Sequence, residues 1–121
     1  MKIVAIRLED LASLMPMSKI VEALDDNGDG AIDAEAWDSV LEQVNEHLIT
    51  LCGSADAVRD RNPRYAAKVF AARTLYTRRG FTGKDNPIEA LALAQEKVLT
   101  ETVSGGTVIQ EKTAFNSKGT F

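Results

Sequence analysis

The longest regular pattern of apolar positions lies between Asp33 and Cys52. Steps of three and four residues align one stripe of side chains along this segment: Trp37, Val40, Leu41, Val44, Leu48 and Leu51. Such spacing is typical of an amphipathic helix with one buried face. Asp33 suits the N-cap position, and Gly53 suits the position that ends a helix. We therefore predict a long helix from Asp33 to about Cys52.

Shorter patterns of the same kind precede this helix. Residues 8–15 place four apolar side chains on one side: Leu8, Leu11, Leu14 and Met15. Pro16 ends this segment, because proline lacks the amide hydrogen that a helix interior needs. A second short helix then runs to Leu24 and leads into an acidic loop.

Two further helices follow a polar linker at residues 54–62. Each opens on an asparagine–proline pair, and proline is favoured at the first helical position. One runs from Pro63 to Arg79 and the other from Ile88 to about Val103. The inner face of the last helix is predicted to hold Ile88, Leu91, Ala92, Val98 and Leu99. The pattern predicts a mainly α protein, a compact bundle of four to five helices over residues 1–103, with an extended tail over 104–121.

The tail begins with a short apolar piece and carries two aromatic residues further on. Thr107, Val108 and Ile109 form a short strand-like piece, and Phe115 and Phe121 follow it. An extended segment of this kind can add a strand to the edge of a partner's sheet, with aromatic side chains as anchors. We predict that the tail docks to a partner protein.

Composition limits the class of protein. The chain has 121 residues and 45% hydrophobic content, enough for one core. It has no apolar run of the roughly 18 residues that cross a bilayer, so we expect no membrane association. Its single cysteine, Cys52, excludes an intrachain disulfide and is typical of a reducing, cytosolic setting.

Charge is unevenly distributed along the chain. Residues 1–57 hold twelve acids and three bases, residues 58–84 hold eight bases and one acid, and residues 85–121 hold five acids and three bases. A lone chain gains little from this separation, whereas copies that pack unlike regions together gain steering and register. The alternative is a solvated basic helix beside an acidic one.

The helix that begins at Pro63 has two different faces. One arc is apolar and holds Tyr65, Ala66, Val69, Phe70 and Tyr76. A separate basic face holds Arg64, Lys68, Arg78 and Arg79. This basic face allows non-specific contact with DNA phosphates. Specific recognition would need aromatic side chains among the bases, and here they lie on the opposite arc.

Arg73 projects into the apolar arc of the same helix. An unpaired buried charge is costly, so we predict that Arg73 pairs with a carboxylate. Candidate partners are Glu42 and Glu46 on the long helix, or an acid on a neighbouring copy. The alternative is that the stem of Arg73 lies on the core while its head reaches water.

The acidic loop matches part of a calcium-loop pattern. Its first, third, fifth, seventh and ninth places are Asp25, Asn27, Asp29, Ala31 (through its carbonyl) and Asp33. The twelfth place is Ala36, where a bidentate glutamate is expected, so a calcium site here would be weak. The alternative is a tight turn that needs no metal. We expect no other cofactor.

Catalytic patterns are poorly supported. His47 is the single histidine, and Cys52 lies near a helix end where nothing activates its thiol. The sequence has no glycine-rich phosphate loop, zinc-ligand spacing or nucleophile motif. We predict that the chain is not an enzyme.

Two segments in this order resemble the small neck-region protein of Mu-like phages and prophages. They are Leu24–Asp33, followed by an amphipathic helix, and Ala71–Arg79, which resembles that family's Ala-Arg-x-x-Leu-Tyr segment. The resemblance covers residues 8–103, and the family is similar to helical head–tail connector (adaptor) proteins. The apolar start, Met1–Ile6, and the tail after Gly106 depart from it.

The resemblance implies a non-enzymatic helical subunit of the virion neck, made in the host cytoplasm. Such a subunit forms a ring under the portal protein, contacts tail or stopper proteins, and lets DNA pass. Rings need head-to-tail contacts between unlike faces, which the charge distribution supplies. Leu93 points away from the inner stripe of its helix, so we predict that it lies in a contact between subunits.

Overall fold

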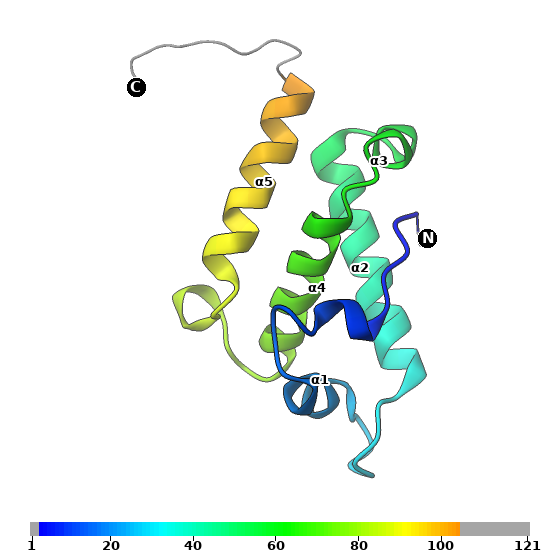
Figure 1. The fold of residues 1–121 in the computed structure, drawn as a ribbon, viewed down its shortest axis with the longest axis vertical. Helices are drawn as coiled ribbons and strands as arrows, with labels where there is room; N and C mark the ends of the chain where they lie inside the picture. The colour runs from blue at the N-terminus through cyan, green and yellow to red at the C-terminus, as the bar shows by residue number, and fades with distance from the viewer. Residues whose placement is uncertain (1–2, 105–121) are drawn as a thin grey trace.

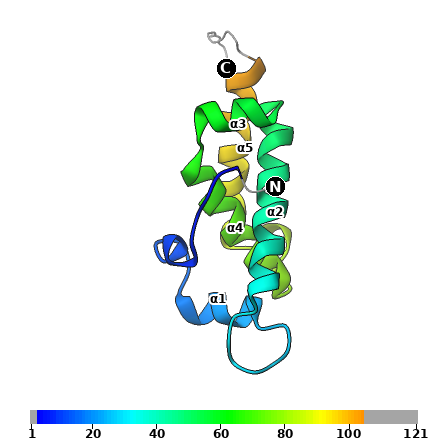
Figure 2. The ribbon, with the colours of Figure 1, turned by 90° about the vertical axis from the view of Figure 1, so that its right-hand side faces the viewer.

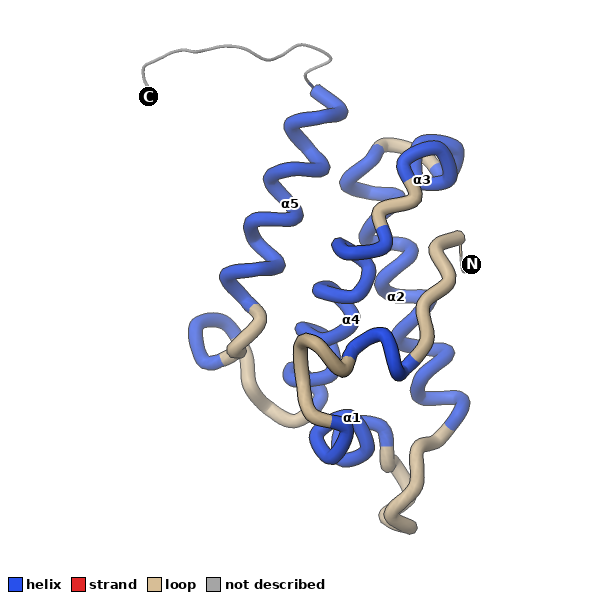
Figure 3. The backbone as a smooth tube through the Cα atoms, viewed as in Figure 1, coloured by secondary structure: helices blue, strands red, loops and turns tan. Residues whose placement is uncertain are grey.

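The computed structural model describes residues 3–104, with side chains for residues 3–101. Every regular element in that range is helical (Figures 1 and 3). In chain order these are η1 (Leu8–Leu11), α1 (Met17–Leu24), α2 (Ala34–Cys52), α3 (Ala55–Arg61), α4 (Arg64–Arg78), η2 (Gly83–Asp85) and α5 (Glu89–Ser104). The predicted mainly α class is confirmed. The predicted tail, with Thr107–Ile109, Phe115 and Phe121, lies outside the described residues.

Three long helices make the body of the bundle. α2, α4 and α5 each contact the other two, while α1 and η1 pack on α4 and α3 packs on α2. In Figure 1, α5 forms one edge of the molecule and α2 the other, with α4 between them. The view in Figure 2 shows α1 crossing the foot of the bundle near the acidic loop. No helix in the described range is long and apolar enough to cross a membrane.

The core follows the predicted stripe of α2. Val40, Leu41, Val44 and Leu48 are buried, and Trp37 and Leu51 are partly buried against them. Phe70 of α4 is the largest fully buried side chain. The small residues of α4 allow close packing around it: Ala66, Ala67, Ala71 and Ala72 are all buried. α4 is therefore the central helix, covered on several sides.

Two predicted elements differ from the structure. The linker at residues 54–62 contains the short helix α3, whose N-cap Ser54 accepts a hydrogen bond from the Ala57 amide at 3.1 Å. With seven residues and one buried side chain, Val58, this helix has no periodicity to read. The predicted helix at residues 8–15 is a single 3-10 turn, η1.

The chain start forms a strap across α2. Val4 and Ile6 are buried, and the amides of Ile3 and Val4 donate to Asn45 Oδ1 at 2.8 and 2.7 Å. Asn45 is fully buried on α2, and its Nδ2 donates to the Leu41 carbonyl at 2.9 Å. One side chain thus supplies the acceptor for two backbone donors far away in sequence.

Candidate functional site

Arg73 is paired, as the sequence predicts, but with acids from a different helix. Its Nη2 lies 2.8 Å from Glu96 Oε2, and its Nη1 lies 3.7 Å from Glu89 Oε1. Both carboxylates belong to α5, whereas Glu42 and Glu46 of α2 are exposed. The guanidinium carbon lies 5.4 Å from the Phe70 ring centroid. With its side chain 20% exposed, Arg73 needs these partners.

His47 joins the same cluster from α2. Its Nε2 lies 2.8 Å from Glu96 Oε2, and its ring meets Phe70 edge-on at a centroid distance of 4.8 Å. Partial burial raises the pKa of Glu96, but the hydrogen bonds from Arg73 and then His47 outweigh burial and lower it below its ordinary value. The cluster therefore links α2, α4 and α5 through one ionised carboxylate.

The lowered pKa of Glu96 gives stability that depends on pH. The contribution is fully present above the ordinary glutamate value of 4.5 and is lost as pH falls through the lower folded value. We expect the wild-type protein to lose more stability in acid than Glu96→Gln, as measured by urea unfolding from pH 6 to pH 3. If the two proteins lose equal stability in acid, the pKa of Glu96 does not differ between the folded and the unfolded state.

Few apolar side chains of α5 are buried against the bundle, and the cluster adds polar contacts to them. Ile88, Ala92 and Leu99 are buried there, but Leu91 and Val98, predicted on the inner face, are 41% and 50% exposed. The acids Glu89 and Glu96 take inner positions instead. At the far end, Arg61 of α3 donates to the Leu99 carbonyl at 3.1 Å. Polar contacts thus hold this helix at two points that the sequence did not indicate.

The basic face of α4 is largely engaged within the chain. Arg78 donates to the Ala23 carbonyl at 2.8 Å and pairs with Asp26 at 2.5 Å. Arg79 pairs with Glu22. The acids all come from the N-terminal half, so part of the charge separation along the sequence is resolved by folding. Folding therefore pairs part of the separated charge within a single chain.

Tyr65 differs from its predicted position on the apolar arc. Ala66, Val69 and Phe70 are buried as predicted, but the Tyr65 side chain is 47% exposed. Lys68 Nζ lies 6.0 Å from the centroid of its ring. An aromatic ring therefore does lie among the basic residues at this end of α4.

The acidic loop closes on its own backbone. Asp25 accepts hydrogen bonds from the amides of Gly28, Asp29 and Gly30 at 2.9, 3.0 and 2.7 Å. The Gly30 amide is the main cause of the lowered pKa of Asp25. Asp29 Oδ1 accepts from the Ala31 amide at 2.9 Å. Gly28 and Gly30 have φ of 77° and 81°, in the region that favours glycine.

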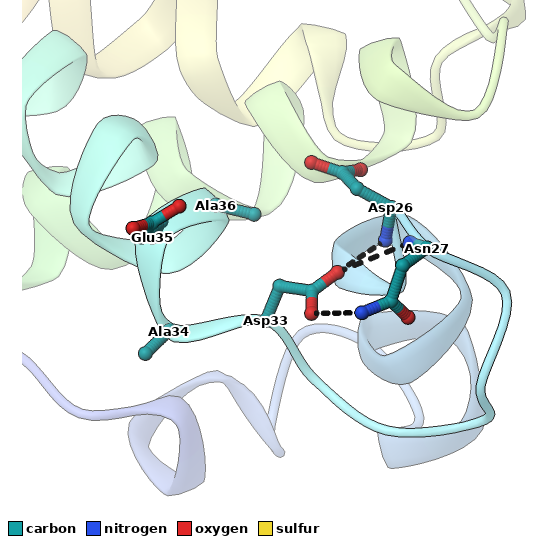
Figure 4. Close-up of a pocket in the computed structure, with 6 residues that line it drawn as sticks. All are labelled: Asp26, Asn27, Asp33, Ala34, Glu35 and Ala36. Atoms are coloured by element: carbon teal, nitrogen blue, oxygen red, sulfur yellow. Dashed lines mark hydrogen bonds between the residues drawn. The ribbon is translucent and has the colours of Figure 1, made fainter.

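Asp33 faces the loop and not the helix that it precedes (Figure 4). Its carboxylate accepts from the Asp26 amide at 2.6 Å and from Asn27 Nδ2 at 3.1 Å. Asp33 holds the predicted N-cap position of α2, but its side chain makes no cap hydrogen bond to that helix. A cavity of about 400 Å³ separates the loop from the start of α2, with Asp26, Asn27, Asp33, Ala34, Glu35 and Ala36 around it.

The structure groups no three His, Cys, Asp or Glu side chains as a metal site within residues 3–101. The loop oxygens instead serve as turn acceptors, which is the alternative that needs no metal. Calcium binding remains a prediction for Asp25, Asn27, Asp29, Ala31 and Asp33. A calcium titration by calorimetry separates the two interpretations. If calcium produces no heat and no change in melting temperature, the loop is a turn and not a metal site.

No family model, curated protein or solved structure matches this chain. The likeness to phage neck proteins therefore depends on the two sequence segments named above.

Proposed function

We propose that this chain is a structural head–tail connector subunit of a tailed-phage neck. In this proposal, copies form a ring between the portal protein and tail or stopper proteins, and DNA passes through the ring. The chain acts by assembly and not by catalysis. The observation that carries the proposal is an apolar surface on the outward side of α5.

This surface lies opposite the packed side of the helix. Leu91 and Leu93 are 41% and 52% exposed on its two flanks, and Ala90 and Ala94 lie exposed between those flanks. Six large apolar side chains are exposed in the described range, and three of them, including Val98, belong to α5. Clustered apolar exposure of this kind marks surfaces that contact other proteins. The predicted subunit contact, Leu93, is the most exposed of the six.

The opposite edge of the molecule differs in character. Glu35, Asp38, Glu42 and Glu46 are all exposed, at steps of three and four residues along α2. At 100° per residue these positions form one acidic line. α2 and α5 form the two edges of the bundle in Figure 1. Head-to-tail contacts in a ring join different faces of neighbouring copies, and in this proposal the outward side of α5 forms one of those faces.

Leu93→Glu tests this assignment. A charge at this exposed apolar position is expected to weaken association by about thirtyfold or more, in the range of interface hot spots. Native mass measurement, with and without a co-expressed portal protein, is expected to show ring-sized particles for the wild-type chain and single chains for the variant.

Met17→Glu is the matched control, because Met17 is exposed to a similar degree on α1 and receives the same charge. It is expected to assemble as the wild type does. A wild-type chain that stays single even with portal protein contradicts the connector function, and normal assembly of Leu93→Glu contradicts the role of α5.

A chain that stops at Gly106 tests the tail, whose proposed role is docking to the portal or a stopper.

A further inference from the structure

Three cations converge at the N-terminal end of α4, around the carboxylate of Asp10. Arg64 lies 3.5 Å from Asp10 through its Nη2 and donates from Nη1 to the Ala5 carbonyl. The pKa of Asp10 is lowered first by the hydrogen bond from the Arg7 amide and then by the charges of Arg64, Arg7 and Lys68. Arg7, Arg64 and Lys68 thus outnumber Asp10 and its neighbour Glu9, which leaves this surface net positive.

An exposed aromatic ring lies within this group. Tyr65 is 47% exposed, lies between Arg64 and the next turn of α4, and has Lys68 Nζ at 6.0 Å from its ring centroid. Lys68 lies beside both Arg64 and Tyr65 on one side of the helix, because residues four and three apart are neighbours on a helix surface. The ring is therefore bordered by positive charge on an accessible surface.

The other end of α4 lacks this excess of charge. Arg78 and Arg79 each have an acid of their own, Asp26 and Glu22. Arg64, by contrast, shares Asp10 with two other bases, and its side chain is 50% exposed. Positive charge without a matching acid is thus concentrated where the exposed ring lies.

We propose that Arg7, Arg64, Lys68 and Tyr65 form a binding surface for single-stranded nucleic acid. The cations contact successive phosphates, and one unpaired base stacks on Tyr65. A cationic track combined with an exposed aromatic ring is the arrangement that binds single strands without sequence preference. A duplex would leave Tyr65 unused, because its bases are already stacked. The site lies on one chain, so it does not depend on the ring.

Fluorescence anisotropy with a labelled oligothymidylate and the isolated full chain tests the site. Two to three phosphate contacts predict a loss of affinity of roughly tenfold between about 50 and 200 mM salt. Tyr65→Ala is expected to weaken binding by about tenfold with the same salt dependence, because it removes stacking and no charge. Lys68→Gln is expected to weaken binding and to reduce the salt dependence.

Asp10→Asn provides a gain of function. It keeps an acceptor for the Arg7 amide but removes the negative charge among the three cations, so binding is expected to tighten by about threefold. Lys84→Gln is the matched control, since it removes one exposed positive charge from η2, beyond the far end of α4, and is expected to bind as the wild type does. Melting temperatures of all variants confirm that they fold.

Three results overturn the proposal: no wild-type binding at the lower salt concentration, unchanged binding by Tyr65→Ala, or equal losses in Lys68→Gln and Lys84→Gln. Equal affinity for a duplex of the same length also overturns it, because base stacking would then have no part. The connector function is tested by assembly mass, so failure here leaves that proposal intact.

Discussion

Replacing Arg73 with alanine is expected to lower the free energy of unfolding by roughly 2–4 kcal/mol, as measured by urea denaturation. The loss arises because Glu96 and Glu89 stay in partly buried positions without the cation that faces them. The guanidinium of Arg73 also lies over the Phe70 ring, and alanine removes that contact. Because the cluster connects three helices, the variant is expected to loosen α5 first.

A double-mutant cycle with Glu96→Gln shows whether the ion pair itself is responsible. In the Glu96→Gln background, Arg73→Ala is expected to cost about 1–2 kcal/mol less than in the wild type, because the unpaired carboxylate is gone. Glu101→Gln is the control background, since Glu101 is an exposed acid of the same helix that pairs with Lys97. A cost for Arg73→Ala that is the same in all three backgrounds would mean that packing, and not charge, accounts for the loss.

The Arg73 cluster shows where sequence periodicity stops being informative. The need for a partner follows from the position of Arg73 on its own helix, and the structure supplies one. The identity of that partner depends on how the neighbouring helix is rotated. A pattern of apolar residues alone predicts Leu91 and Val98 on the buried face of α5. In the structure, Glu89 and Glu96 of α5 face Arg73, while Leu91 and Val98 are exposed.

Long elements were predictable and short ones were not. α2, α4 and α5 each carry enough turns for a pattern to emerge, and the structure places them within one or two residues of the predicted bounds. α3 has seven residues and depends on Ser54 and on one buried side chain. The exposure of Tyr65 was equally hidden, because only one side of the first turn of α4 is exposed, while Ala66 and Ala67 of the same turn are buried. The candidate nucleic-acid surface therefore became visible only in three dimensions.

Asn45 is a second buried polar group that periodicity does not reveal, and its removal has a comparable expected effect. Asn45→Ala leaves the amides of Ile3 and Val4 without their acceptor, and Val4 is buried. Each buried donor that loses its partner costs about 1–3 kcal/mol, so a total loss of roughly 2–4 kcal/mol is expected. Denaturant unfolding measures the total, and hydrogen exchange at Val4 is expected to become fast as the strap detaches.

Val4→Ala separates detachment of the strap from a general weakening of the core. In the wild type, this change removes apolar contact from a fully buried position and costs about 1–2 kcal/mol. In the Asn45→Ala background it is expected to cost much less, because a strap that has already left α2 no longer buries Val4. Losses that simply add would mean that the strap stays in place without Asn45. In that case the apolar contacts of Val4 and Ile6 hold the chain start on the bundle, rather than the two hydrogen bonds to Asn45 Oδ1.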